Sequence, residues 1–137
     1  MNDSTKSSLL LGGRFLLALM FILAGFGKLT NAGATAQFMA SGGLPNMPSL
    51  ALLVGLFEVL AGIALIVGFK ARWAALALAI FTAVATLMFH AYWSMPADQQ
   101  YMQQLMFLKN LAVVGGMLAV AALGAGPWSV DAVYGRD

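Results

Sequence analysis

The sequence predicts an all-α integral membrane protein, a bundle of four helices that cross a bilayer. Of its 137 residues, 61% are hydrophobic and only 9% are charged. A soluble domain is typically about 45–50% apolar and about 25% charged. The seven basic and five acidic side chains are too few to cover a water-facing surface, so most of the surface must face lipid. The length fits a single domain, residues 1–137.

Four hydrophobic segments are each long enough to cross the membrane. A helix needs about 20 apolar residues to span a hydrocarbon core about 30 Å thick. The segments that meet this length are residues 9–29, 48–69, 73–93 and 101–123. The first is longer than the apolar part of a signal peptide, which is about 7–15 residues, so we expect it to be retained.

The connections between the spans predict their arrangement. Residues 30–47 are rich in Gly, Ala, Ser, Asn and Pro, and we expect residues 34–40 to form a short helix at the membrane interface. The very short basic turn at 70–72 makes the second and third spans antiparallel neighbours. Two glycines and a proline end the last span and leave residues 124–137 as an interfacial tail.

The distribution of Lys and Arg predicts the orientation. When the four spans alternate, five cations fall on one side, namely Lys6, Arg14, Lys70, Arg72 and Arg136. The opposite side carries Asp98 and one cation, Lys28, at a helix end. Because short loops rich in Lys and Arg stay in the cytoplasm, we expect both termini there. The 34–40 helix then lies in the first extracytoplasmic loop.

Several polar and ionisable side chains fall inside the predicted spans. An ionisable group in the bilayer core costs at least a few kcal/mol, so it tends to face the bundle interior and to be functional. Glu58 lies near the midplane, ten residues beyond the start of its span, by the helical rise of about 1.5 Å per residue. The candidate site residues of the outer half are Lys28, Glu58, His90, Lys109 and Asn110, and Arg14 lies near the cytoplasmic side.

Helical spacing places these side chains on small or polar stripes. The stripes are residues 14, 18, 21, 25 and 28; residues 51, 55, 58 and 62; residues 82, 86 and 90; and residues 109, 112, 116 and 119. Small residues on such stripes let membrane helices approach closely. The pattern therefore predicts a bundle whose polar groups face inward.

The charged candidates also have structural explanations. A lone carboxylate at the midplane is unfavourable, so we expect Glu58 to pair with Lys109 or Arg14. Such a pair could be purely structural, although buried pairs are often no more stabilising than apolar substitutes. Arg14 could form a cytoplasmic-side ion pair, extend to the headgroups or bind a lipid phosphate.

The remaining candidates have structural alternatives as well. Lys28 could extend its ammonium group to the headgroups. His90 could simply form a hydrogen bond with Thr86. Asn110 could join two helices by an interhelical hydrogen bond.

The composition excludes several kinds of chemistry. The chain has no cysteine, which excludes disulfides, thiolate ligands and thiol nucleophiles. With one histidine and no cysteine, we expect no metal site and no pair of haem ligands. The apolar composition, without a basic tract, excludes nucleic acid as a partner. We expect no covalently bound cofactor and no redox centre within this chain.

A set of motifs runs from Arg14 to Asp131. After Arg14 come AGFGK at 24–28, QFM at 37–39, GGLP at 42–45, FE at 57–58, VGF at 67–69, FH at 89–90, MFLKN at 106–110, GG at 115–116 and GPWSVD at 126–131. This set resembles the DoxX family of small four-helix bacterial membrane proteins. The order of the charged residues makes the resemblance specific. Its short members, often described as quinol oxidase subunits, imply a multi-pass protein of the bacterial inner membrane.

The resemblance implies a role near the quinone pool, with Lys28, Glu58, His90 and Lys109 lining the site. We therefore expect a quinone- or lipophilic-substrate-binding subunit of a membrane redox system, with a polar pocket in the outer half of the bundle. Without its own redox centre, the chain could be an enzyme only as a subunit of a quinone-linked oxidoreductase. Its expected partners are the lipid bilayer and either a second copy or a redox partner subunit.

Two other functions fit the sequence. A structural or assembly protein could use the charged stripes to dock partners. A small-solute transporter could use a charged cavity between helices, although the sequence has no clear inverted repeat or broken helix.

Overall fold

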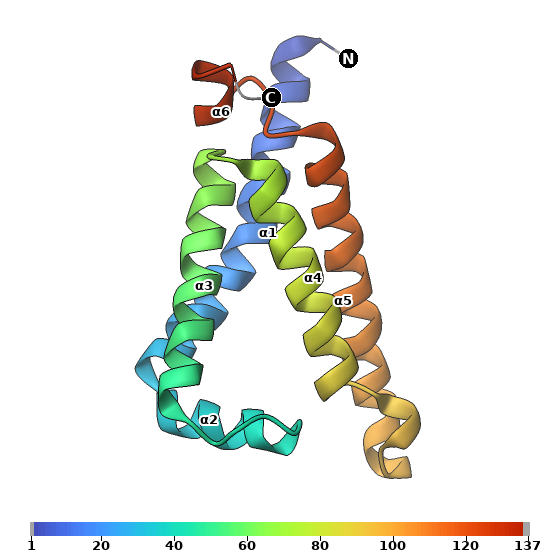
Figure 1. The fold of residues 1–137 in the computed structure, drawn as a ribbon. Helices are drawn as coiled ribbons and strands as arrows, with labels where there is room; N and C mark the ends of the chain where they lie inside the picture. Colours follow the sequence, from blue (N-terminus) through green and yellow to red (C-terminus); the bar gives the residue numbers. More distant parts are fainter. Residues whose placement is uncertain (1, 136–137) are drawn as a thin grey trace.

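The computed structural model describes residues 2–135, and these are helical almost throughout (Figure 1). The elements are α1 (Asp3–Thr30), α2 (Ala32–Ser41), α3 (Pro48–Val67), α4 (Ala71–Phe89), the 3-10 helix η1 (Tyr92–Ser94), α5 (Ala97–Leu123) and α6 (Val130–Val133). No strand forms within residues 2–135. The helices α1, α3, α4 and α5 are long and apolar enough to cross a membrane. The predicted all-α membrane bundle is confirmed. Arg136, one of the five cations that predict the orientation, lies outside the described residues.

The helix limits differ from the predicted spans for local reasons. α1 begins at Asp3 because the Asn2 side chain accepts a hydrogen bond from the Thr5 amide at 2.8 Å, a typical N-cap. α3 ends before Gly68, whose φ of +70° is a left-handed conformation that glycine adopts at little cost. α4 ends at Phe89, earlier than the predicted 93, and α5 begins at Ala97, earlier than the predicted 101.

The four long helices form two pairs that converge at one end (Figure 1). α1 packs along α3 and α4 packs along α5, whereas α3 and α4 make far fewer contacts with each other. We call the converging end the terminal end, because α1 begins there and α6 lies there. We call the opposite end, where α2 and η1 lie, the loop end. The predicted helix in the first loop is present as α2, which runs across the loop end from the α1–α3 pair (Figure 1).

Two glycines let the backbones of α1 and α3 touch. A Cβ atom on Gly25 would lie 2.6 Å from the Gly55 carbonyl oxygen, and one on Gly55 would lie 2.8 Å from the Gly25 carbonyl oxygen. The same virtual Cβ atoms would lie 3.0 Å from Cβ of Glu58 and 3.0 Å from Cβ of Lys28, respectively. Close approach through glycine is typical of membrane helix pairs, and here it places Lys28 beside Glu58.

The terminal end is held together partly by Asp131 of α6. Its carboxylate accepts hydrogen bonds from the amides of Lys70 and Ala71, at 2.7 and 2.8 Å, where α4 begins. Its own amide donates to the Gly68 carbonyl at 2.8 Å. The first amides of a helix have no partner within that helix, and the N-cap residue Lys70 supplies no side-chain cap. Asp131 therefore caps α4 from a distant part of the chain.

Two arginines bind carbonyl oxygens at helix C-termini. Arg14 is 1% exposed and donates to two carbonyls in the last turn of α3, each at 3.1 Å, and to the Trp128 carbonyl at 2.7 Å. Arg72 donates to the Ala121 carbonyl, near the end of α5, at 3.1 Å. Cations are favoured at helix C-termini by the helix dipole. These carbonyls hold the Arg14 guanidinium inside the protein, and its expected ion pair or lipid contact stays a prediction.

Candidate ligand-binding site

A cavity of about 400 Å³ lies between the two helix pairs, on the side of the loop end. Its wall is mainly apolar, with Val54 and Phe81 among the residues that α3 and α4 contribute. The polar side chains in the wall are Lys28, Thr35, Glu58 and His90. A mainly apolar cavity of this size with a few polar groups is typical of small-molecule sites, which measure roughly 300–1,000 Å³.

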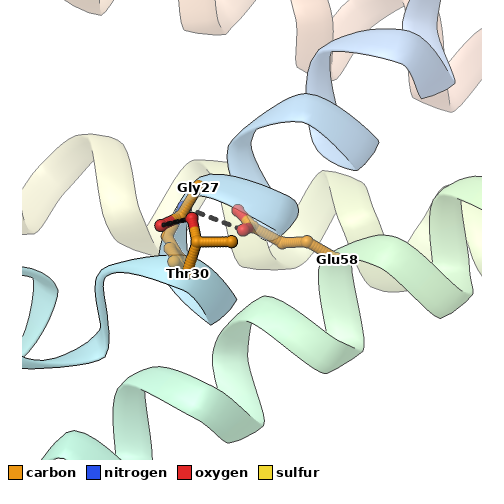
Figure 2. A network of polar contacts seen from close by, with 4 residues as sticks. Gly27, Thr30 and Glu58 are labelled. Carbon is orange, nitrogen blue, oxygen red and sulfur yellow. Dashed lines mark hydrogen bonds and ion pairs between the residues drawn. The ribbon is translucent and has the colours of Figure 1, made fainter.

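Lys28 and Glu58 form an ion pair in the cavity wall. Nζ of Lys28 lies 2.8 Å from Oε2 of Glu58, and the two side chains are 26% and 4% exposed. In Figure 2, Glu58 extends from α3 toward the last turn of α1, where Gly27 and Thr30 lie. The pair therefore joins the two helices of the α1–α3 pair at the cavity.

The partner of Glu58 differs from the sequence-based expectation, which named Lys109 or Arg14. Arg14 is occupied with carbonyl groups near the terminal end, and Lys109 lies on α5 outside the cavity wall. Lys28 is the partner because the contact between Gly25 and Gly55 brings the adjacent turns of α1 and α3 together.

The Glu58 carboxylate has unused capacity to accept hydrogen bonds. The Lys28 ammonium group lies 2.8 Å from Oε2 and provides its ion pair, and no further donor from residues 2–135 reaches that oxygen. Oε1 takes no part in the ion pair and has no hydrogen-bond donor among the same residues. An ionised carboxylate can accept about four hydrogen bonds, and a buried charge with few partners is unfavourable. Glu58 therefore offers at least one oxygen to a donor in the cavity.

His90 lies in the cavity wall and is held by a residue of α5. Its Nδ1 lies 2.7 Å from Oε1 of Gln103. Because an amide oxygen only accepts, the neutral ring carries its proton on Nδ1 and leaves Nε2 as an acceptor. The alternative side-chain bond to Thr86 is not formed, since the Thr86 hydroxyl donates to the Thr82 carbonyl at 2.6 Å. Gln103 was not singled out from the sequence.

Lys109 and Asn110 lie outside the cavity wall. Phe107, two residues before Lys109, packs against Tyr92 and Trp93 with ring centroids 5.6 Å apart in both pairs. Tyr and Trp are enriched at membrane interfaces, so Lys109 lies roughly 3 Å along the helix from that level. An exposed lysine at this depth can extend its ammonium group to the headgroups.

An aromatic contact that was not predicted from the sequence joins α2 to α4 at the loop end. The rings of Phe38 and Phe89 stack with centroids 4.9 Å apart and an interplanar angle of 21°. Gly42 lies so close to the Phe89 ring that a Cβ atom there would overlap with it. Both phenylalanines belong to the cavity wall. The aromatic residue in the QFM motif and the following Gly-Gly pair were the available signals.

These features define a class of protein: a four-helix membrane protein with a mainly apolar cavity between two helix pairs and an ion pair in the cavity wall. The chain belongs to the DoxX family, because the family model DoxX matches residues 9–91. The resemblance predicted from the motifs is therefore confirmed.

Two relatives from Escherichia coli (strain K12) are similar over nearly their whole length. Inner membrane protein YqjF is 36% identical over 123 residues, which cover 90% of this chain and 89% of that protein. Inner membrane protein YphA is 36% identical over 129 residues, which cover 93% of this chain and 91% of that protein. Together with the four membrane helices, these relatives confirm that the chain is an inner-membrane protein.

A longer eukaryotic protein is also similar to this chain. The Surfeit locus protein 4 homolog of Schizosaccharomyces pombe is 30% identical over 123 residues, which cover 88% of this chain but only 36% of that protein. The similarity therefore concerns about a third of the longer protein. No solved structure matches the chain.

Proposed function

We propose that this protein binds a lipophilic ligand of the quinone class in the cavity between its two helix pairs, as a subunit of a membrane redox system. The observation that carries the proposal is the ion pair of Lys28 and Glu58 in the wall of a mainly apolar cavity. Buried ion pairs are often no more stabilising than apolar residues of the same size. A function in ligand binding gives a reason for keeping this pair in a membrane protein.

The wall suits a ring with an apolar tail. Val54 and Phe81 provide apolar contact for the ring or tail. The ammonium group of Lys28 has three N–H donors, of which Glu58 occupies one, so it can donate to a ligand oxygen. His90 offers a second polar group toward the loop end of the cavity.

The redox chemistry belongs to the ligand and to a partner. A quinone, when bound, supplies two-electron, two-proton chemistry. In this chain, Lys28, Glu58 and His90 form hydrogen bonds with the polar end of the ligand, and the apolar side chains of the cavity wall exclude water. A redox partner subunit would supply or remove the electrons, and a second copy of the chain could complete the assembly.

We also propose that the terminal end faces the cytoplasm, which places the cavity in the outer half of the membrane. Among residues 2–135, the cations Lys6, Arg14, Lys70 and Arg72 belong to the terminal end. Because the chain has no cysteine, Ser4→Cys and Gln99→Cys can each be labelled with a membrane-impermeant maleimide in intact cells. Labelling of Gln99→Cys but not of Ser4→Cys is expected, and the reverse pattern would overturn the orientation.

The binding proposal is tested with the purified protein in a mild detergent. Solvent extraction followed by chromatography should show a co-purifying quinone, and calorimetric titration with a decyl-substituted benzoquinone should give a saturable site. Lys28→Met should weaken that binding, while Lys109→Met, outside the cavity, serves as the matched control. Absence of a co-purifying quinone together with absence of saturable binding would overturn the proposal.

A further inference from the structure

We infer that the cavity selects ligands whose polar end carries a hydroxyl group, so that a hydroquinone binds more tightly than the quinone with the same ring and tail. This inference rests on the proposed function and specifies the ligand of the same site. Its basis is the hydrogen-bonding capacity that the ion pair leaves unused at the cavity.

The Glu58 carboxylate is buried and has few hydrogen-bond donors. Its residue is 3% exposed, so water satisfies little of its carboxylate. Lys28 provides the ion pair to Oε2, 2.8 Å away, whereas Oε1 has no donor from the part of the chain that the structure describes. A buried carboxylate with so few donors is stabilised by a ligand that donates to it.

The polar end of the cavity contains both a hydrogen-bond donor and a hydrogen-bond acceptor. Lys28 donates and Glu58 accepts, and their charged atoms are 2.8 Å apart. A hydroxyl group can accept from an ammonium group and donate to a carboxylate at the same time. A quinone carbonyl can only accept, so it accepts from Lys28 and leaves Oε1 of Glu58 without a donor. The carbonyl oxygen also places its lone pairs near the carboxylate, which is repulsive.

The size of the preference follows from one charge-assisted hydrogen bond. Such a bond is worth roughly tenfold or more in affinity. A tenfold tighter binding of the reduced form raises the two-electron midpoint potential of the bound couple by about 30 mV. The site would therefore hold its ligand preferentially in the reduced form.

The test compares three ligands of matched shape on the unaltered protein. They are a decyl-substituted benzoquinone, its hydroquinone, and the dimethyl ether of that hydroquinone, each titrated anaerobically by calorimetry in mild detergent. The hydroquinone should bind roughly tenfold more tightly than the quinone. The ether keeps the aromatic ring of the reduced form but has no donor, so it should bind no more tightly than the quinone.

A variant assigns the preference to the carboxylate. Glu58→Gln replaces one acceptor oxygen by an amide that can donate to a carbonyl, so the ratio of the two affinities should fall to about one or below. Lys109→Met, on the exposed side of α5, should keep the tenfold ratio. If Glu58→Gln fails to fold, the three-ligand comparison on the unaltered protein still decides the inference.

The outcomes separate the inference from the proposed function. Equal affinities for the two redox forms, or tighter binding of the quinone or the ether, would overturn the hydroxyl preference and leave the proposed function standing. No saturable binding of any of the three ligands would overturn the hydroxyl preference, and together with the absence of a co-purifying quinone it would overturn the proposed function as well. A tenfold preference that persists in a folded Glu58→Gln variant would overturn the role given to Glu58.

Discussion

The contact between α1 and α3 predicts that Gly25→Ala destabilises the protein. The added Cβ atom would lie 2.6 Å from the Gly55 carbonyl oxygen and 2.9 Å from Cγ2 of Val59. The first distance is about 0.7 Å shorter than the 3.3 Å lower end of ordinary C–H···O contacts. Because the obstacle is backbone, α1 and α3 must separate by a similar amount. Overpacking of this kind costs about 1–3 kcal/mol in the free energy of unfolding.

The chain offers a matched control for this substitution. Gly27 lies on the same helix, two residues later, and a Cβ atom there would have no neighbour within 4 Å. Gly27→Ala should therefore leave the free energy of unfolding unchanged or raise it by up to about 1 kcal/mol, through helix propensity. Both variants are compared by titration from mild detergent into sodium dodecyl sulfate, monitored by circular dichroism. Equal unfolding curves for the two variants would contradict the proposed glycine contact.

Three further changes probe other contacts. Asp131→Asn should lower the free energy of unfolding by about 1–3 kcal/mol, because the Asn side chain has one acceptor oxygen for the two backbone amides that Asp131 caps. Asp98→Asn, at an exposed position, is the control, and equal melting temperatures of the two variants would argue against the cap. Lys28→Met should weaken binding of the decyl benzoquinone at least about tenfold by calorimetry, whereas Lys109→Met should not change its Kd. Phe38→Ala removes one ring of the stack that joins α2 to α4 in the cavity wall. Because this part of the wall would then be less firmly held, ligand dissociation should be faster in stopped-flow experiments; an unchanged rate would show that the stack does not retain the ligand.

The membrane helices could be predicted from the sequence because hydropathy is a property of consecutive residues. The four spans and the short helix in the first loop are present as expected. The helix ends were predicted less well, because they depend on caps. Asn2 extends α1 toward the N-terminus, and α5 continues through a polar first turn that carries no hydropathy signal.

The pairing of charges could not be predicted, because it depends on how each helix is rotated and which helices touch. Helical spacing put Glu58 on a small-residue stripe, and the structure keeps it buried there. The choice of Lys28 as its partner follows from the α1–α3 crossing at Gly25 and Gly55, which joins residues distant in sequence. Lys109 had a similar spacing pattern, yet α5 turns that residue outward.

Asp131 shows a further limit of the sequence. A single aspartate after four apolar spans suggests only an exposed tail, whereas the structure buries it against the turn between α3 and α4. The motif GPWSVD contained a local signal, because Ser129 accepts a hydrogen bond from the Ala132 amide at 3.1 Å and starts α6. That signal predicts a helical turn but does not say which distant amides the turn will meet.

The position of Asp131 in the chain has a consequence for how the protein is made. The amides of Lys70 and Ala71 belong to the second connection between membrane helices, and their acceptor follows the last of those helices. During synthesis, the hairpin of α3 and α4 therefore enters the membrane before its own turn can be capped. The turn is completed only when the α6 segment leaves the ribosome and returns to it. A chain interrupted within α5 would present an uncapped hairpin, a state that a membrane protease could distinguish from the finished protein.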